Sequence, residues 1–141
     1  MKINHLLETN SILSKFISEI RDENIQKDKM RFRRNIERIG EILGYELSKN
    51  LHYSLKEIKT PLGKKNLNLQ DDPIVLCSIL RAGLPLHNGL LNYFDDSENG
   101  FISAYGKHDE HSDNSEIIVE YFASPNLENK VLILADPMLA T

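Results

Sequence analysis

The sequence contains one cysteine and no long hydrophobic run, and both features narrow the class of protein. Cys77 alone cannot form a disulfide within the chain, which is typical of a reducing compartment. No apolar stretch approaches the roughly 20 residues that a transmembrane helix needs. The start, MKINHLLETN, has one lysine and a short apolar pair before an acid, so it does not resemble a signal peptide. We expect a cytoplasmic protein without a membrane anchor.

An excess of positive charge is also missing. The 141 residues include 17 Lys and Arg against 21 Asp and Glu, which gives a formal net charge of −4 at pH 7. This balance gives no electrostatic reason to expect binding to nucleic acids, although a local positive site on an acidic protein can still bind an anionic small molecule. With 40% hydrophobic and 27% charged residues, the chain can bury the core of one domain, or of most of one.

Helical periodicity marks the first third of the sequence. In residues 11–21 and 29–49, apolar side chains recur at intervals of three and four, the period of an amphipathic helix. In the second segment this stripe consists of Phe32, Ile36, Ile39, Leu43 and Leu47. Gly40 and Gly44 each lower helix propensity by about 1 kcal/mol relative to Ala, and they could let another element approach closely. We predict an N-terminal helical region over residues 1–50.

Short apolar runs predict strands in the rest of the chain. The candidate strands are 73–80, 100–105, 117–122 and 130–136. The middle two are expected to pair as a hairpin arm over 100–122, a short helix is predicted at 84–94, and the polar stretch 59–73 is either a connection or an irregular edge strand. The first and last runs are continuously apolar, as in strands covered on both faces. The pattern predicts an α/β fold whose largely parallel sheet lies in 73–141.

Polar residues follow both of the continuously apolar runs. Arg81 comes directly after the first run, and Asp136 comes directly after the second. Ligands of open parallel sheets bind beyond the carboxyl ends of the strands. A guanidinium suits phosphate oxygens, and a carboxylate suits sugar hydroxyls or a cation. The same residues are also compatible with an ordinary surface charge and a helix N-cap, so the pattern by itself leaves both interpretations open.

Longer segments around these two residues resemble a known family. SILRAGLPLHNGLL and VLILADPMLAT together resemble the uracil phosphoribosyltransferases, a family of type I phosphoribosyltransferases. The resemblance extends over nearly the whole chain and includes IKTPLG and VEYFASP. DPMLAT is its most specific part, because most enzymes of this fold have two adjacent acids where the uracil enzymes have an acid and a proline. The resemblance implies a mostly parallel sheet with N-terminal helices and a protruding hairpin.

The resemblance also implies an activity. Such enzymes convert 5-phosphoribosyl 1-diphosphate (PRPP) and uracil into uridine monophosphate (UMP) and pyrophosphate, a pentosyl transfer of pyrimidine salvage. By resemblance, Arg81 contacts the diphosphate, and the catalytic residue Asp136 holds the ribose hydroxyls. Backbone N–H groups of the following loop would bind the 5-phosphate, beginning with Pro137, Met138, Leu139, Ala140 and Thr141. Magnesium would be bound through the diphosphate. The resemblance suggests a homodimer or a higher homo-oligomer, and some relatives are activated by GTP.

The sequence departs from the family pattern in two places. Family members continue after the threonine with small residues, a helix and a segment that supplies most uracil contacts. We therefore expect residues 1–141 to form a single incomplete domain, truncated at the PRPP loop and inactive by itself. Gly106 stands where the family usually has an arginine that also binds the diphosphate. Lys107 could supply a charge, but a step of one residue in a strand turns the side chain to the other face.

Three interpretations of function are open at this stage. The first is a uracil phosphoribosyltransferase, and the second is a catalytically inactive homologue or fragment that acts as a binding or regulatory partner. Gly106 and the abrupt end of the sequence favour the second. The third is the same kind of enzyme acting on another base, which the sequence cannot test because the base-recognition segment is absent.

Other polar residues are weaker candidates. The sequence GKHDEHSDNSE gathers His108, Asp109, Glu110, His111 and Asp113, but no spacing there is diagnostic of a metal site. His5, His52 and His87 are scattered along the chain. Cys77 is expected to be a buried small residue, and Tyr93 and Phe94 are expected to belong to the core.

Overall fold

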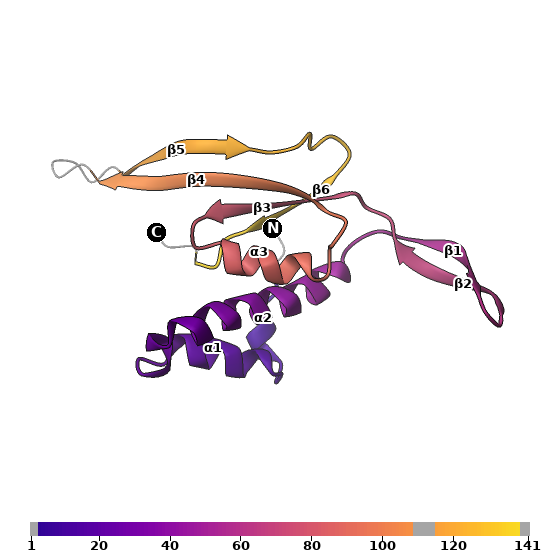
Figure 1. Cartoon of the computed structure of the whole chain (residues 1–141), viewed down its shortest axis with the longest axis horizontal. Coiled ribbons are helices and arrows are strands. Elements are labelled where there is room, and N and C mark those ends of the chain that lie inside the picture. The colour runs from indigo at the N-terminus through magenta and orange to yellow at the C-terminus, as the bar shows by residue number, and fades with distance from the viewer. Residues whose placement is uncertain (1–2, 109–114, 139–141) are drawn as a thin grey trace.

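A computed structural model describes residues 3–108 and 115–138, which form a twisted sheet lying on a layer of helices (Figure 1). In these residues the α-helices are α1 (Leu13–Arg21), α2 (Lys29–Ser48) and α3 (Leu84–Leu91), with short 3-10 helices η1 (Leu6–Glu8) and η2 (Ile25–Lys27). The strands are β1 (Tyr53–Thr60), β2 (Gly63–Gln70), β3 (Ile74–Leu80), β4 (Glu98–His108), β5 (Ser115–Ala123) and β6 (Val131–Ala135). The predicted α/β fold is confirmed.

The helices begin and end close to the residues that periodicity predicts. Helix α2 begins after Asp28, whose side chain accepts hydrogen bonds from the backbone N–H groups of Met30 and Arg31. Such a cap satisfies donors that the first turn leaves unpaired. Helix α3 ends at Leu91, three residues earlier than predicted. Beyond it Phe94 is buried as expected, whereas Tyr93 is 52% exposed and does not belong to the core.

The main sheet has the strand order β5-β4-β3-β6. Strand β3 is parallel to both of its neighbours, β4 and β6, and β5 pairs antiparallel with β4 as the predicted hairpin arm. The centre of the sheet is apolar because residues 74–77 of β3 are all buried. Helix α3 packs on β3, and α2 packs on α3, so the helices cover one face of the sheet.

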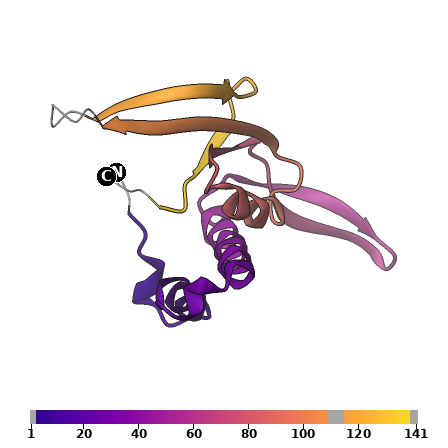
Figure 2. The same ribbon diagram turned by 60° about the vertical axis from the view of Figure 1, so that its left-hand side comes forward.

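Residues 53–70 differ from the prediction. Instead of a connection or an irregular edge strand, β1 and β2 form a separate antiparallel hairpin with eight paired positions, from Tyr53 opposite Gln70 to Thr60 opposite Gly63. Gly63 has φ +137°, which only glycine adopts readily. The hairpin projects from the rest of the molecule (Figures 1 and 2). Its strands are mostly exposed, so the sequence contains no run of buried residues that would mark them.

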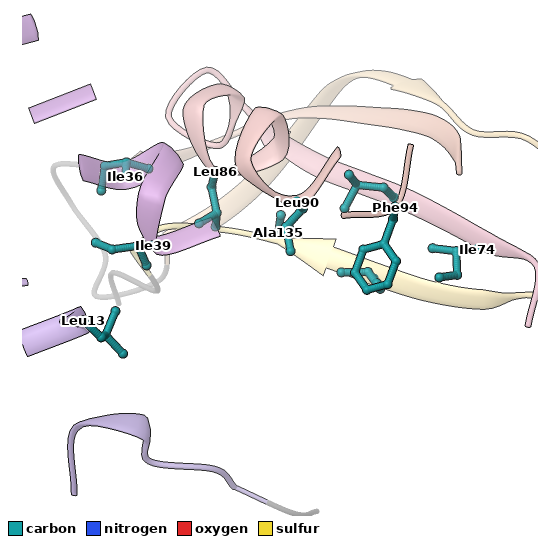
Figure 3. Close-up of a cluster of buried hydrophobic side chains, with 10 residues drawn as sticks. Leu13, Ile36, Ile39, Ile74, Leu86, Leu90, Phe94 and Ala135 are labelled. Carbon is teal, nitrogen blue, oxygen red and sulfur yellow. The ribbon is translucent and has the colours of Figure 1, made fainter. Parts of the chain in front are cut away.

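The hydrophobic core lies between the sheet and the helices (Figure 3). Leu76 of β3 and Leu90 of α3 are almost completely buried in it, and Ala135 of β6 joins them from the neighbouring strand. Ile36 and Ile39 of the predicted apolar stripe extend this cluster through α2 to Leu13 of α1. The core therefore fixes the position of both β3 and β6 relative to the helices.

One glycine of α2 allows α3 to approach closely. A Cβ atom on Gly40 would lie 2.5 Å from the backbone oxygen of Leu86, whereas a Cβ atom on Gly44 would meet only the side chains of Tyr93 and Leu90, at 3.4 Å or more. We expect Gly40→Ala to lower the free energy of unfolding by about 3 kcal/mol, because the backbones must move apart. Gly44→Ala is the matched control, and helix propensity favours it by up to about 1 kcal/mol. Urea unfolding of both variants measures this, and equal stabilities would contradict the assigned helix contact.

Candidate active site

Neighbouring parallel strands bring the two predicted site residues to the same edge of the sheet. Ser78 of β3 pairs with Ala135 of β6. Arg81 lies three residues beyond the first, and Asp136 lies one residue beyond the second. The two loops also touch, because a Cβ atom on Gly83 would lie 3.2 Å from the backbone oxygen of Ala135. Arg81 and Asp136 therefore follow adjacent strand ends, where open sheets bind their ligands.

Arg81 belongs to a short loop between β3 and α3. Its side chain is exposed, and it makes no ion pair with any other residue in the described part of the chain. The peptide bond that joins it to Leu80 is cis. Backbone hydrogen bonds from Gly83 N to Ile79 O (2.9 Å) and from Leu84 N to Arg81 O (3.3 Å) hold this loop. The guanidinium is thus presented to solvent by a tightly bonded turn.

Asp136 is half-buried and lies against a cavity. Its Oδ1 accepts a hydrogen bond from the backbone N–H of Met138 (3.2 Å), which orients the carboxylate in the loop. The cavity has a volume of about 530 Å³, and Leu86, Leu90 and Ala135 also line it. Such a volume is within the range of small-molecule sites. The carboxylate therefore has one oxygen in a local turn and the other available for a ligand.

The remaining loop residues lie partly outside the described chain. Pro137 is half-buried, and Met138 is 73% exposed. Leu139, Ala140 and Thr141, the other predicted phosphate contacts, lie outside the described residues. The loop that was predicted to bind the 5-phosphate is therefore seen only at its first two positions.

Strand β4 extends the site on the other side of Arg81. Leu80, the last residue of β3, pairs with Ser103, so Gly106 lies three positions beyond the end of β3 in the parallel direction. The backbone of Gly106 pairs with Ile117, and that of Lys107 pairs with Glu116. Arg81 thus follows a strand that lies between β6, which leads to Asp136, and β4, which carries Gly106.

A chain of three hydrogen-bonded polar side chains, two of them buried, connects β3, α3 and β4, and sequence reasoning missed it. His87 of α3 is 2% exposed. Its Nδ1 is 2.7 Å from Ser78 Oγ, and its Nε2 is 2.7 Å from Asn99 Oδ1. Burial lowers the pKa of His87 below its ordinary value of 6.5, although the bond to Asn99 opposes this shift. The imidazole is therefore neutral at pH 7. A histidine in the mostly apolar helix LPLHNGLL was the one available signal.

The other candidates from the sequence do not form sites in the described residues. Burial raises the pKa of the Cys77 thiol, and its sulfur is a free, buried thiol, which agrees with a small core residue. The residues described contain no group of three His, Cys, Asp or Glu side chains that could hold a metal ion. Asp109, Glu110, His111 and Asp113 lie outside them. No helix in the same residues is long and apolar enough to cross a membrane.

Comparison with known proteins gives concordant results. The family model described as uracil phosphoribosyltransferase matches residues 7–141. The chain is 50% identical over 141 residues to a uracil phosphoribosyltransferase of Porphyromonas gingivalis, covering 100% of the chain and 65% of that protein. It is 38% identical over 136 residues to that of Methanothermobacter thermautotrophicus, covering 94% of the chain and 60% of the relative.

A solved structure shares the fold. The AQ2163 protein from Aquifex aeolicus is similar with a TM-score of 0.79 and 28% sequence identity, over 100% of this chain and 63% of that one. The chain thus spans slightly less than two thirds of the length of the curated relatives and of this structure.

Proposed function

Because this chain belongs to the uracil phosphoribosyltransferase family, we propose that the protein transfers the phosphoribosyl group of PRPP to uracil. The bond between C1 of the ribose and the diphosphate oxygen breaks, and pyrophosphate leaves with the electron pair. A new bond joins C1 to N1 of uracil, which loses its proton, and the product is UMP. The observation that carries this proposal is the pairing of β3 with β6, because it sets Arg81 and Asp136 at adjacent strand ends.

Each site residue has a role that its chemistry supports. Arg81 would donate hydrogen bonds to the diphosphate, whose oxygens gain negative charge as the bond to C1 breaks. Asp136 would accept hydrogen bonds from the ribose hydroxyls and so orient C1 toward the base. Pro137 and the loop that follows it would bind the 5-phosphate through backbone N–H groups. Lys107, the residue after Gly106 in β4, would be a secondary source of positive charge near the diphosphate.

Magnesium fits this site only as a partner of the substrate. Mg²⁺ is usually held by one or two carboxylates together with substrate phosphates. The substrate phosphates would hold the ion here, because the described residues contain no group of three His, Cys, Asp or Glu side chains that could hold it by itself. Bound with PRPP, the ion would neutralise part of the charge of the diphosphate.

A turnover assay tests the proposed activity. The assay uses the intact protein, meaning a polypeptide of the full length of the curated relatives, of which this chain spans 65% in the first case. It is incubated with PRPP, uracil and magnesium, and UMP is measured by chromatography; orotate, hypoxanthine and guanine serve as alternative bases. We expect UMP with uracil and no comparable nucleotide with the other bases. Absence of all nucleotide products would refute the proposal, and preference for another base would correct the substrate.

A polypeptide of residues 1–141 is expected to be inactive by itself. The chain spans 65% of the uracil phosphoribosyltransferase of Porphyromonas gingivalis, so 35% of that relative's length has no counterpart in residues 1–141. In addition, Leu132 and Leu134 of β6 are 46% and 55% exposed, and an edge strand with such side chains is stabilised when another element covers it. In the same assay this polypeptide should form UMP at a rate at least about a thousandfold below that of the intact protein. Measurable UMP would contradict the expectation.

Introducing the family's arginine at position 106 tests the diphosphate site. Gly106→Arg should lower the KM for PRPP by tens-fold, because one charge-assisted hydrogen bond to a phosphate contributes on the order of 2 kcal/mol. Gly106→Gln, which has a long uncharged side chain, is the matched control. If the arginine variant keeps the parent's KM, Gly106 does not lie beside the diphosphate.

The proposal extends to assembly and location. Exposed apolar side chains on one edge of the sheet support a homodimer or a higher homo-oligomer; they are Ile117, Val119, Tyr121 and Phe122 of β5. Activation by GTP and a cytoplasmic location remain predictions made from the sequence.

A further inference from the structure

A side-chain hydrogen bond joins the two ends of the segment that carries Arg81. Ser78 is the last fully buried residue of β3, and His87 lies in the first turns of α3. The hydrogen bond between them joins residues nine positions apart and spans the whole loop. His87 is also bonded through its backbone N–H to the oxygen of Gly83 (2.8 Å). The loop is thus fixed where the strand ends and again where the helix begins.

The direction of each hydrogen bond follows from the chemistry of its atoms. Asn99 Nδ2 donates to the backbone oxygen of Ser97 (3.3 Å), so Asn99 Oδ1 faces the imidazole and can only accept. Nε2 of His87 therefore carries the proton and donates to Asn99. In the neutral ring Nδ1 then accepts, and the Ser78 hydroxyl donates to it. All three side chains are satisfied in one tautomer.

The chain of hydrogen bonds connects three elements, of which β3 and α3 flank the loop that carries Arg81. Ser78 belongs to β3, His87 to α3, and Asn99 to β4. The imidazole also packs against the ring of Phe101, with 4.9 Å between the ring centroids. A buried polar network that is fully satisfied specifies one arrangement of the elements that it connects.

We propose that Ser78, His87 and Asn99 form a clasp that positions Arg81 for the diphosphate of PRPP. This inference rests on the proposed function and adds to it three positioning residues that do not touch the substrate. Ser78 is completely buried and His87 is 2% exposed, so neither can bind a ligand directly. Their effect on catalysis would pass through the loop, whose ends they hold. Loss of the clasp should therefore weaken PRPP binding specifically and leave uracil binding unchanged.

The test compares variants that remove a hydrogen bond of the clasp with a variant that removes the hydrogen bonds of a buried side chain away from the loop of Arg81. Ser78→Ala removes the donor to Nδ1, and Asn99→Leu removes the acceptor of Nε2; Asn99→Asp keeps that acceptor. Asn35→Ala is the control. Asn35 is also completely buried, with two side-chain hydrogen bonds, to Glu19 (2.7 Å) and from Arg38 (3.1 Å), but it lies in the helical layer.

The intact protein is assayed for KM of PRPP, KM of uracil, kcat and the unfolding midpoint. We expect Ser78→Ala and Asn99→Leu to raise the KM for PRPP by about tenfold, since small misplacements of a binding group are costly, with the KM for uracil unchanged. Asn99→Asp should remain near the parent, and Asn35→Ala should lower only the unfolding midpoint. Because Asn99 lies at an exposed position, its variants should fold even if Ser78→Ala does not.

Two results would overturn the inference: one contradicts the clasp alone, and the other contradicts the proposed function as well. If the parent is active and both clasp variants keep its KM for PRPP while losing stability as Asn35→Ala does, the three residues serve folding only. If the parent neither turns over uracil nor binds PRPP in a calorimetric titration, the proposed function and the clasp fail together.

Discussion

Arg81→Ala is expected to lower kcat/KM for PRPP by about a hundred- to a thousandfold, the effect of removing one preorganised donor from a developing negative charge. Arg81 follows the central strand β3 and is exposed at the end of the sheet that the site occupies. Its guanidinium would interact more strongly with departing pyrophosphate than with bound PRPP, so both kcat and KM should change. Steady-state kinetics with PRPP varied at saturating uracil measures the effect.

Two further variants complete this test: one keeps the positive charge without the guanidinium, and the other is a control at an arginine away from the site. Arg81→Lys keeps a positive charge but not the planar pair of donors, so its activity should lie between those of the parent and Arg81→Ala. Arg21→Ala removes another exposed arginine, in the last turn of α1, and should leave kcat/KM within about twofold, as is usual for surface changes away from the site. Parent-like kinetics for Arg81→Ala would contradict its assignment to the diphosphate.

Asp136→Asn is expected to lower kcat/KM for PRPP by about a hundredfold, because the charged acceptor of the ribose hydroxyls is lost. The substitution is conservative for the loop. Oδ1 accepts the hydrogen bond from Met138 N, and the amide oxygen of asparagine can accept it as well. A loss of activity with an unchanged unfolding midpoint would therefore report on the ligand rather than on the fold.

The control for this variant is Asp95→Asn, which changes an exposed carboxylate beyond the end of α3. It should have the parent's kinetics. Titration calorimetry with PRPP completes the comparison, since weaker binding by Asp136→Asn alone would link the defect to the sugar diphosphate. Equal affinity of the parent and Asp136→Asn would contradict the proposed ribose contact.

Much of the fold could be predicted because its elements have strong local patterns. Helix α2 follows from the apolar stripe that includes Ile36 and Ile39, and both residues are in the core. The strands β3 and β6 follow from continuous apolar runs, and their pairing places the two charged residues at one edge. Hairpin β1–β2 was not predicted because its stability does not come from burial. Its strands expose most of their side chains, and main-chain pairing leaves little trace in a sequence.

The sequence likewise predicts only part of the candidate site. The positions of Arg81 and Asp136 at strand ends could be inferred, because the strands that precede them are recognisable. The clasp could not, since Ser78, His87 and Asn99 come from three elements and have no characteristic spacing. Only the packing of α3 over β3 and β4 brings them within hydrogen-bond distance. The roles of the loop beyond Met138 rest on family resemblance, because Leu139, Ala140 and Thr141 lie outside the described residues.

The most direct measurement is a crystal structure of the intact protein with PRPP and magnesium. We predict diphosphate oxygens within about 3 Å of the Arg81 guanidinium and ribose hydroxyls within a similar distance of the Asp136 carboxylate, in one ligand between the ends of β3 and β6. PRPP bound elsewhere, or bound here without either side chain, would contradict the claim that these two residues hold the same sugar diphosphate.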